Sequence, residues 1–126
     1  MRRTTHFNPE TDRALRCPCC GEGKLAIATF IVLENVRVWF GQPVTVTSSC
    51  RCSKHNAIVG GADDSEHLDE TVYDGIEATA ADIVVKDVPP SDVYDFLCSR
   101  PYANLLGIGK YDNFTHVDTR GHTARW

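Results

Sequence analysis

Residues 65–82 read SEHLDETVYDGIEATAAD, and this stretch decides how the rest of the chain is interpreted. It carries His67 after a glycine-rich loop and ends at Asp82, which opens the apolar run Ile83-Val84-Val85. Because β-branched residues favour strands, Asp82 is predicted near the start of a strand over residues 80–86. A carboxylate buried there is costly unless it has a partner.

A second histidine, His116, lies in an alternating run further along the chain. Residues 114–119 predict a strand that forms a hairpin with residues 108–111. Two imidazoles and a carboxylate on neighbouring elements are typical of a zinc site that keeps one position for water. Spacing alone leaves two interpretations open, because no H-E-x-x-H helix fixes the geometry. Either His67, Asp82 and His116 bind zinc, or they are ordinary solvated or buried side chains.

The remaining pattern predicts a single α+β domain over residues 1–126. We expect a small, mostly antiparallel sheet with helices packed on one side. In chain order, the other expected elements are a polar, extended lead-in over 1–16, a helix over 24–40 ended by Gly41, a strand over 44–47, a short helix over 53–59, a surface loop over 63–77, and a helix over 92–99 introduced by Pro89-Pro90.

Composition and charge argue against two classes of partner. The net charge of -4 lacks the basic surplus of nucleic-acid-binding proteins, so no nucleic acid is expected. The longest apolar run, residues 25–33, is too short to span a bilayer, so no membrane is expected either. The first residues have no apolar segment of a secretory signal, which predicts synthesis in the cytoplasm without a signal peptide.

Six cysteines are many for a cytoplasmic chain of this length, and five of them form two clusters. The clusters span residues 17–20 and 50–52, and Cys98 stands apart. Together the clusters could bind a structural zinc or form disulfides. Their C-x-C-C and C-x-C spacings differ from the usual C-x-x-C knuckle, which favours separate buried or surface thiols.

Six short segments resemble the peptidase M15 family, and most closely its short subgroup from phage and prophage genomes. The family's S-x-H-x-x-G-x-A-x-D motif and its later histidine are specific when they occur together. The resemblance extends over roughly residues 17–126, and it implies the hedgehog-like fold of DD-peptidases. The segments that carry it are residues 47–56, 59–61, 65–68, 80–83, 107–112 and 116–118.

The resemblance implies a zinc metallopeptidase that hydrolyses a peptide bond in bacterial peptidoglycan stem peptides. It would be a carboxypeptidase or an endolysin-like endopeptidase, with Zn²⁺ as cofactor. His67, Asp82 and His116 match the zinc ligands, Arg51 matches the arginine that steadies the oxyanion, and Ser65 matches the motif serine near the substrate. We expect a monomer that other factors deliver from the host cytoplasm to the cell wall.

The chain departs from the family at the general base. Many members carry Glu or Asp three residues before the last histidine, where this chain has Asn113. Asp118 or Asp112 is then the candidate base. Asp118 is favoured slightly. It follows His116 by two positions, and residues two apart in a strand project from the same face.

The chain also departs from the family in the spacing of its ligands. Fourteen residues separate His67 from Asp82, whereas the family motif leaves six. Asp74 has the family spacing, but it lies in a glycine-containing turn without the following strand. We interpret residues 69–77 as containing an insertion and favour Asp82. Two rival hypotheses stay open, namely a non-catalytic phage structural or wall-binding module on the same fold, and a structural module whose cysteines hold zinc.

Overall fold

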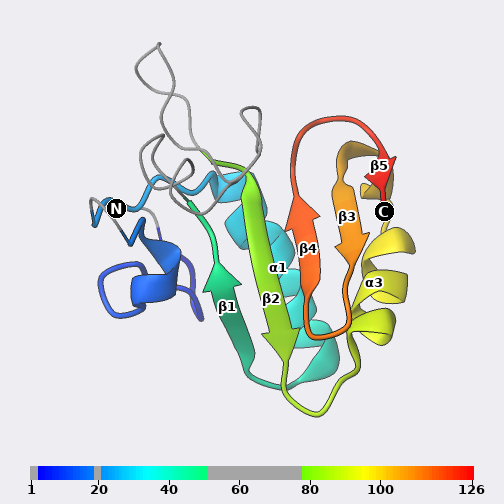
Figure 1. Cartoon of the computed structure of the whole chain (residues 1–126), viewed down its shortest axis with the longest axis horizontal. Coiled ribbons are helices and arrows are strands. Elements are labelled where there is room, and N and C mark those ends of the chain that lie inside the picture. Colours follow the sequence, from blue (N-terminus) through cyan, green and yellow to red (C-terminus); the bar gives the residue numbers. More distant parts are fainter. Residues whose placement is uncertain (1–2, 19–20, 51–77) are drawn as a thin grey trace.

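The structure is a computed structural model that describes residues 3–18, 21–50 and 78–126, and its centre is an open sheet (Figure 1). The strands lie in the order β1-β2-β4-β3-β5. β1, β2, β4 and β3 pair antiparallel, and only β5 joins its neighbour β3 in parallel. This confirms the mostly antiparallel sheet. The strands are β1 (Val44–Ser48), β2 (Ala80–Val85), β3 (Gly107–Lys110), β4 (Thr115–Asp118) and β5 (Ala124–Arg125).

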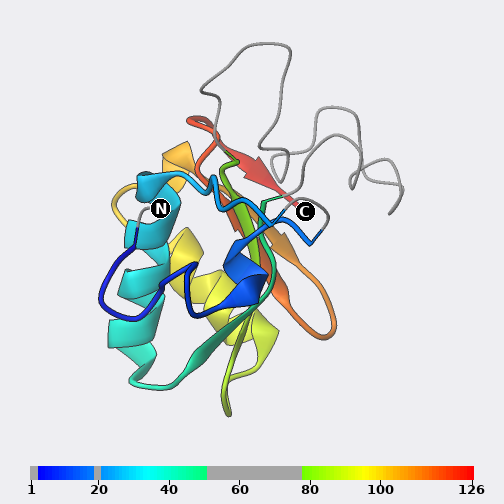
Figure 2. The same ribbon diagram turned by 90° about the vertical axis from the view of Figure 1, so that its left-hand side faces the viewer.

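The two α-helices of the described residues lie on the same side of this sheet, as Figure 2 shows in side view. They are α1 (Ile27–Phe40) and α3 (Pro90–Cys98). Two short 3₁₀ helices, η1 (Arg13–Leu15) and η2 (Ala103–Leu105), complete the described elements. The prediction of an α+β fold with helices packed on one side is therefore confirmed.

The ends of α1 show where local sequence decides the structure and where it does not. Gly41 ends the helix as predicted, with a left-handed φ of 64° that glycine adopts without strain. The helix begins at Ile27, three residues later than predicted. The delay arises because Leu25 forms a parallel bridge with Ala78, and the backbone N–H of Ala78 donates to the Lys24 carbonyl at 2.9 Å.

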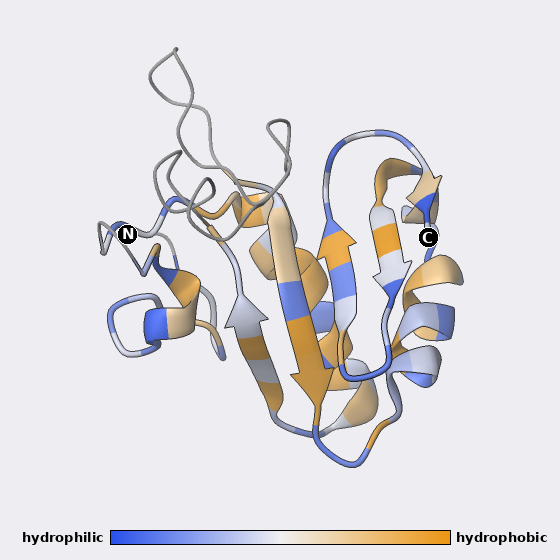
Figure 3. Cartoon of the chain, viewed as in Figure 1, coloured by the Kyte–Doolittle hydropathy of each residue, from blue (hydrophilic) through white to orange (hydrophobic). Residues whose placement is uncertain are grey.

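The hydrophobic core lies between the helices and the sheet face that they cover. Figure 3 shows β2 as apolar along most of its length with one hydrophilic band, and Asp82 is the charged residue of that strand. Alternate residues of a strand project from opposite faces, so the core-facing and outward-facing sets are separate. The buried residues of the sheet and helices that form the core include Phe30, Leu33, Val36, Ile83, Val85, Val93, Leu97, Ile108 and Val117.

The N-terminal residues contradict the prediction of an extended lead-in. Phe7 and Leu15 are buried in the core, and Leu15 belongs to η1. The His6 backbone N–H donates to Glu34 of α1 at 2.6 Å, which ties this segment to the helix. The local sequence is polar, and the contacts that bury its two large apolar side chains come from residues distant in the chain.

Two predicted elements, the helix over residues 53–59 and the loop over 63–77, lie outside the described residues. The described helices include none long and apolar enough to cross a membrane. Within the described part of the chain, no disulfide joins Cys17, Cys50 or Cys98. Cys17 and Cys50 are nevertheless close to one carbonyl, that of Glu22, which accepts from the Cys17 N–H at 2.8 Å and from the Cys50 thiol at 3.5 Å.

Candidate active site

The candidate site is built on the sheet face opposite the helices. Asp82 of β2 pairs directly with His116 of β4, and His116 pairs in turn with Gly109 of β3. These three positions form one row across the sheet. Because Ile83 and Val117, the next residues along their strands, face the core, the row projects from the other face. The strands that contain Asp82 and His116 are therefore neighbours in the sheet.

The imidazole of His116 lies between two carboxylates. Its Nδ1 lies 2.9 Å from Oδ1 of Asp82, and its Nε2 lies 2.8 Å from Oδ2 of Asp118. Asp118 is two residues further along β4, so its side chain lies on the same face, as the sequence predicted. The side chain of His116 is only 10% exposed, and that of Asp118 is fully buried. The ring is thus held in one orientation by both of its nitrogens.

Asp118 also accepts hydrogen bonds from groups other than His116. Arg120 binds it with two parallel contacts, Nε to Oδ1 at 2.8 Å and a terminal nitrogen to Oδ2 at 2.7 Å. The backbone N–H groups of Gly107 and Arg120 also donate to Oδ1, each at 3.2 Å. A Cβ on Gly107 would lie 2.6 Å from Nε of Arg120, so glycine is required for this close approach.

These contacts shift the pKa values of the central groups. Burial alone would lower the pKa of His116, but the hydrogen bonds and charges of Asp118 and Asp82 raise it above its ordinary value. Burial alone would raise the pKa of Asp118, but hydrogen bonds from Arg120 and His116 hold it well below the usual range. Asp118 is therefore a carboxylate that stays ionised, and Asp82 places a second carboxyl group beside Nδ1 of His116.

The donor set at this point fits a divalent metal ion. Zinc takes imidazole nitrogen and carboxylate oxygen, and here Nδ1 of His116 faces Oδ1 of Asp82. Metal-binding histidines usually donate their other ring N–H to a carboxylate, which is the contact between Nε2 and Asp118. The negative charges that favour a proton at Nδ1 also favour a cation there. In residues 3–18, 21–50 and 78–126 no three His, Cys, Asp or Glu side chains are arranged so that together they could hold a metal ion, and His67 lies outside these ranges.

Some of the predicted site residues lie close together, and others lie outside the described residues. Asp82, His116 and Asp118 form one cluster. Asp112 lies in the exposed turn between β3 and β4. The remaining predicted site residues fall outside the described residues; they are Arg51, Ser65, His67 and the alternative ligand Asp74.

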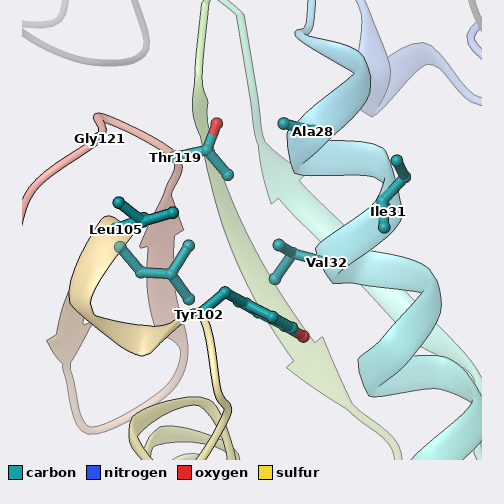
Figure 4. A pocket seen from close by; sticks show the side chains of 8 residues that line it. Ala28, Ile31, Val32, Tyr102, Leu105, Thr119 and Gly121 are labelled. Atoms are coloured by element: carbon teal, nitrogen blue, oxygen red, sulfur yellow. The ribbon is translucent and has the colours of Figure 1, made fainter.

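An apolar pocket on the helix side of the sheet is separate from this cluster (Figure 4). It encloses about 290 Å³ between α1, η2 and the segment after β4. Its lining contains no histidine, cysteine, aspartate or glutamate, so it lacks the side chains that usually bind a divalent metal ion. The lining residues are Ala28, Ile31, Val32, Tyr102, Leu105, Leu106, Thr119 and Gly121.

Sequence reasoning missed two residues of the site. Arg120 follows Asp118 by two positions, and this spacing could have indicated an ion pair on one side of the chain. Trp126 lies beside His116, with ring centroids 4.9 Å apart, because the two-residue strand β5 returns it to β3. No local pattern marks so short a strand, so no sequence signal could have placed Trp126.

Comparison with known proteins identifies one matching family. A family model described as peptidase M15 matches residues 4–118, which is most of the chain. The matched region includes Asp82, His116 and Asp118, and it ends before Arg120 and Trp126. No curated protein and no solved structure matches the chain.

Proposed function

The chain belongs to the peptidase M15 family, and we propose that it is a zinc metallopeptidase that cleaves bacterial peptidoglycan stem peptides. Family membership supports a peptidase of the metal-dependent kind. The single observation that carries the finer proposal is the contact of His116 Nδ1 with Asp82 Oδ1, backed by Asp118 on the second ring nitrogen. We propose that His67, from the motif S-x-H, completes the ligand set.

Each residue then has a defined task. When bound, zinc would polarise the scissile carbonyl and supply a nucleophilic water near neutral pH. Asp82 and His116 would hold the ion from two adjacent, paired strands, and this pairing fixes the separation of the two residues without ordering a loop. Asp118 holds the imidazole of His116 in the tautomer whose Nδ1 carries the lone pair. Arg51 would stabilise the oxyanion of the tetrahedral intermediate.

The role of Asp118 in this proposal differs from the general base favoured by the sequence. Its two oxygens accept five hydrogen bonds, from His116, Gly107 and Arg120. A carboxylate so occupied, buried and stabilised in its ionised form is a poor acceptor for a substrate proton. We assign Asp118 to positioning His116, and we propose that Asp112, in its exposed turn, takes the proton.

Digestion of purified peptidoglycan tests the proposed function. We expect the zinc-loaded protein to release new peptide ends, the chelated protein to release none, and added zinc to restore release. Free D-alanine would identify a carboxypeptidase, and new amino groups within the stem would identify an endopeptidase. Equal release by a metal-free preparation would refute zinc dependence. No release under any metal condition would favour a non-catalytic wall-binding module.

Arg51→Ala is expected to lower kcat by about a hundredfold or more, the scale seen when an oxyanion donor is lost. Zinc content should stay unchanged, because the arginine is not a ligand. Arg51→Lys should restore little activity, since an ammonium lacks the planar fork of a guanidinium. Steady-state kinetics on stem peptide with parallel metal analysis measures both effects. Wild-type turnover in both variants would show that Arg51 has no catalytic role.

A further inference from the structure

Trp126 is the large aromatic side chain beside the candidate site, and its position is built into the fold. Its backbone N–H donates to the Ile108 carbonyl at 3.1 Å, and its own carbonyl accepts from the Lys110 N–H at 2.9 Å. The indole N–H donates to the Tyr111 hydroxyl at 2.7 Å. The backbone of Trp126 is thus fixed by β3 on both sides of Gly109, and its indole is held by Tyr111, the residue that follows β3.

Gly109 provides the space that the indole occupies. A Cβ at this position would lie 2.6 Å from Cε2 of Trp126 and would also collide with its Nε1. Gly109 pairs with His116 across the sheet, and His116 pairs with Asp82. The indole therefore covers Gly109, the third position in the row that Asp82 and His116 begin. The indole and imidazole rings meet at 4.9 Å with an interplanar angle of 48°.

Much of the indole is open to solvent despite these contacts. Trp126 is 45% exposed, whereas His116 beside it is 8% exposed. The guanidinium carbon of Arg120 lies 5.3 Å from the indole centroid, so the ion pair with Asp118 borders the same surface. A rigid, half-exposed aromatic ring next to a reactive centre offers apolar contact at little entropic cost.

We propose that Trp126 is a specificity-determining residue that forms an apolar wall of the substrate cleft, against which the peptide residue next to the scissile bond packs. This inference rests on the proposed function, because it places the cleaved peptide over His116. Gly109 has the matching role of leaving room for the indole. The assignment concerns substrate binding, and it leaves metal binding to Asp82 and His116.

Kinetics on a soluble stem pentapeptide tests the proposal. Trp126→Ala should raise KM by about tenfold, the scale of one small apolar contact in a binding pocket, with zinc content unchanged. Gly109→Ala should raise KM similarly because it displaces the indole. The double variant should be no worse than Trp126→Ala alone, since both changes remove one contact. Trp39→Ala is the matched control: Trp39 is 64% exposed and packs on Phe96, so KM should not change.

Fluorescence gives a readout that is independent of turnover. The chain has two tryptophans, so Trp39→Phe leaves Trp126 as the sole emitter. Saturating pentapeptide should shift its emission to shorter wavelength, and Trp126→Phe, which leaves only Trp39, should show no shift. A wild-type KM in Trp126→Ala, or an unshifted emission while the peptide is cleaved, overturns the inference alone. A wild-type protein that neither binds nor cleaves the peptide overturns both this inference and the proposed function.

Discussion

Asp82→Ala is expected to empty the metal site and to abolish peptide hydrolysis, whereas Asp74→Ala should keep most of both. Asp82 is held in β2, directly paired with His116, and its Oδ1 lies 2.9 Å from Nδ1 of that histidine. Metal ligands must be held to within a few tenths of an ångström, which a paired strand achieves. Asp74 has the family's spacing from His67 and is the alternative that sequence alone cannot dismiss.

Metal analysis and hydrolysis assays on the two purified variants decide between these aspartates. A stable fold in each variant is checked by circular dichroism, so that a lost metal is not confused with a lost structure. If Asp74→Ala is the variant that loses zinc while Asp82→Ala retains it, residues 69–77 contain no insertion and the ligand set must be reassigned.

Asp118→Asn is expected to weaken zinc binding by about 10- to 100-fold, the usual effect of losing a carboxylate behind a metal-binding histidine. Every oxygen of Asp118 accepts from at least two donors, so the amide nitrogen of asparagine would face a donor in either orientation. The free energy of unfolding should fall by about 3 kcal/mol, the low end for breaking a buried ion pair, because Arg120 is partly exposed.

The zinc dependence of kcat separates positioning from proton transfer at Asp118. If Asp118 positions His116, the Asn variant should regain most of its turnover at saturating zinc. If Asp118 is the general base, turnover should stay low with the site fully loaded. Asp112→Asn is the matched control for zinc affinity, since Asp112 lies in an exposed turn and its removal should leave the binding constant unchanged.

Much of the fold could be predicted because its elements carry local signals. The strand that contains Asp82 and the end of α1 at Gly41 follow from β-branched runs and from glycine's access to positive φ. The burial of Phe7 and the late start of α1 could not be predicted. Both depend on contacts with residues far along the chain, namely the packing of the N-terminal segment on the core and the bridge of Leu25 with Ala78.

The candidate site likewise contains residues whose positions local patterns predicted and residues whose positions depend on distant contacts. Period-two alternation placed His116 and Asp118 on one strand face, and the contact of Nε2 with Asp118 agrees with it. The interpretation of Asp118 as a base did not anticipate that Arg120 would occupy both of its oxygens. The position of Trp126 could not be predicted, because it depends on a two-residue parallel strand and on the absence of a side chain at Gly109.

The most direct test of the central claim is the number of zinc equivalents bound per chain in the wild type and in the His67→Ala/His116→Ala double variant. We predict that the wild type binds zinc at the histidine and aspartate site, and that the double variant loses one equivalent while keeping its fold. Unchanged zinc in the double variant would contradict the account, because the metal would then be held elsewhere, with the cysteine clusters as the remaining thiolate ligands.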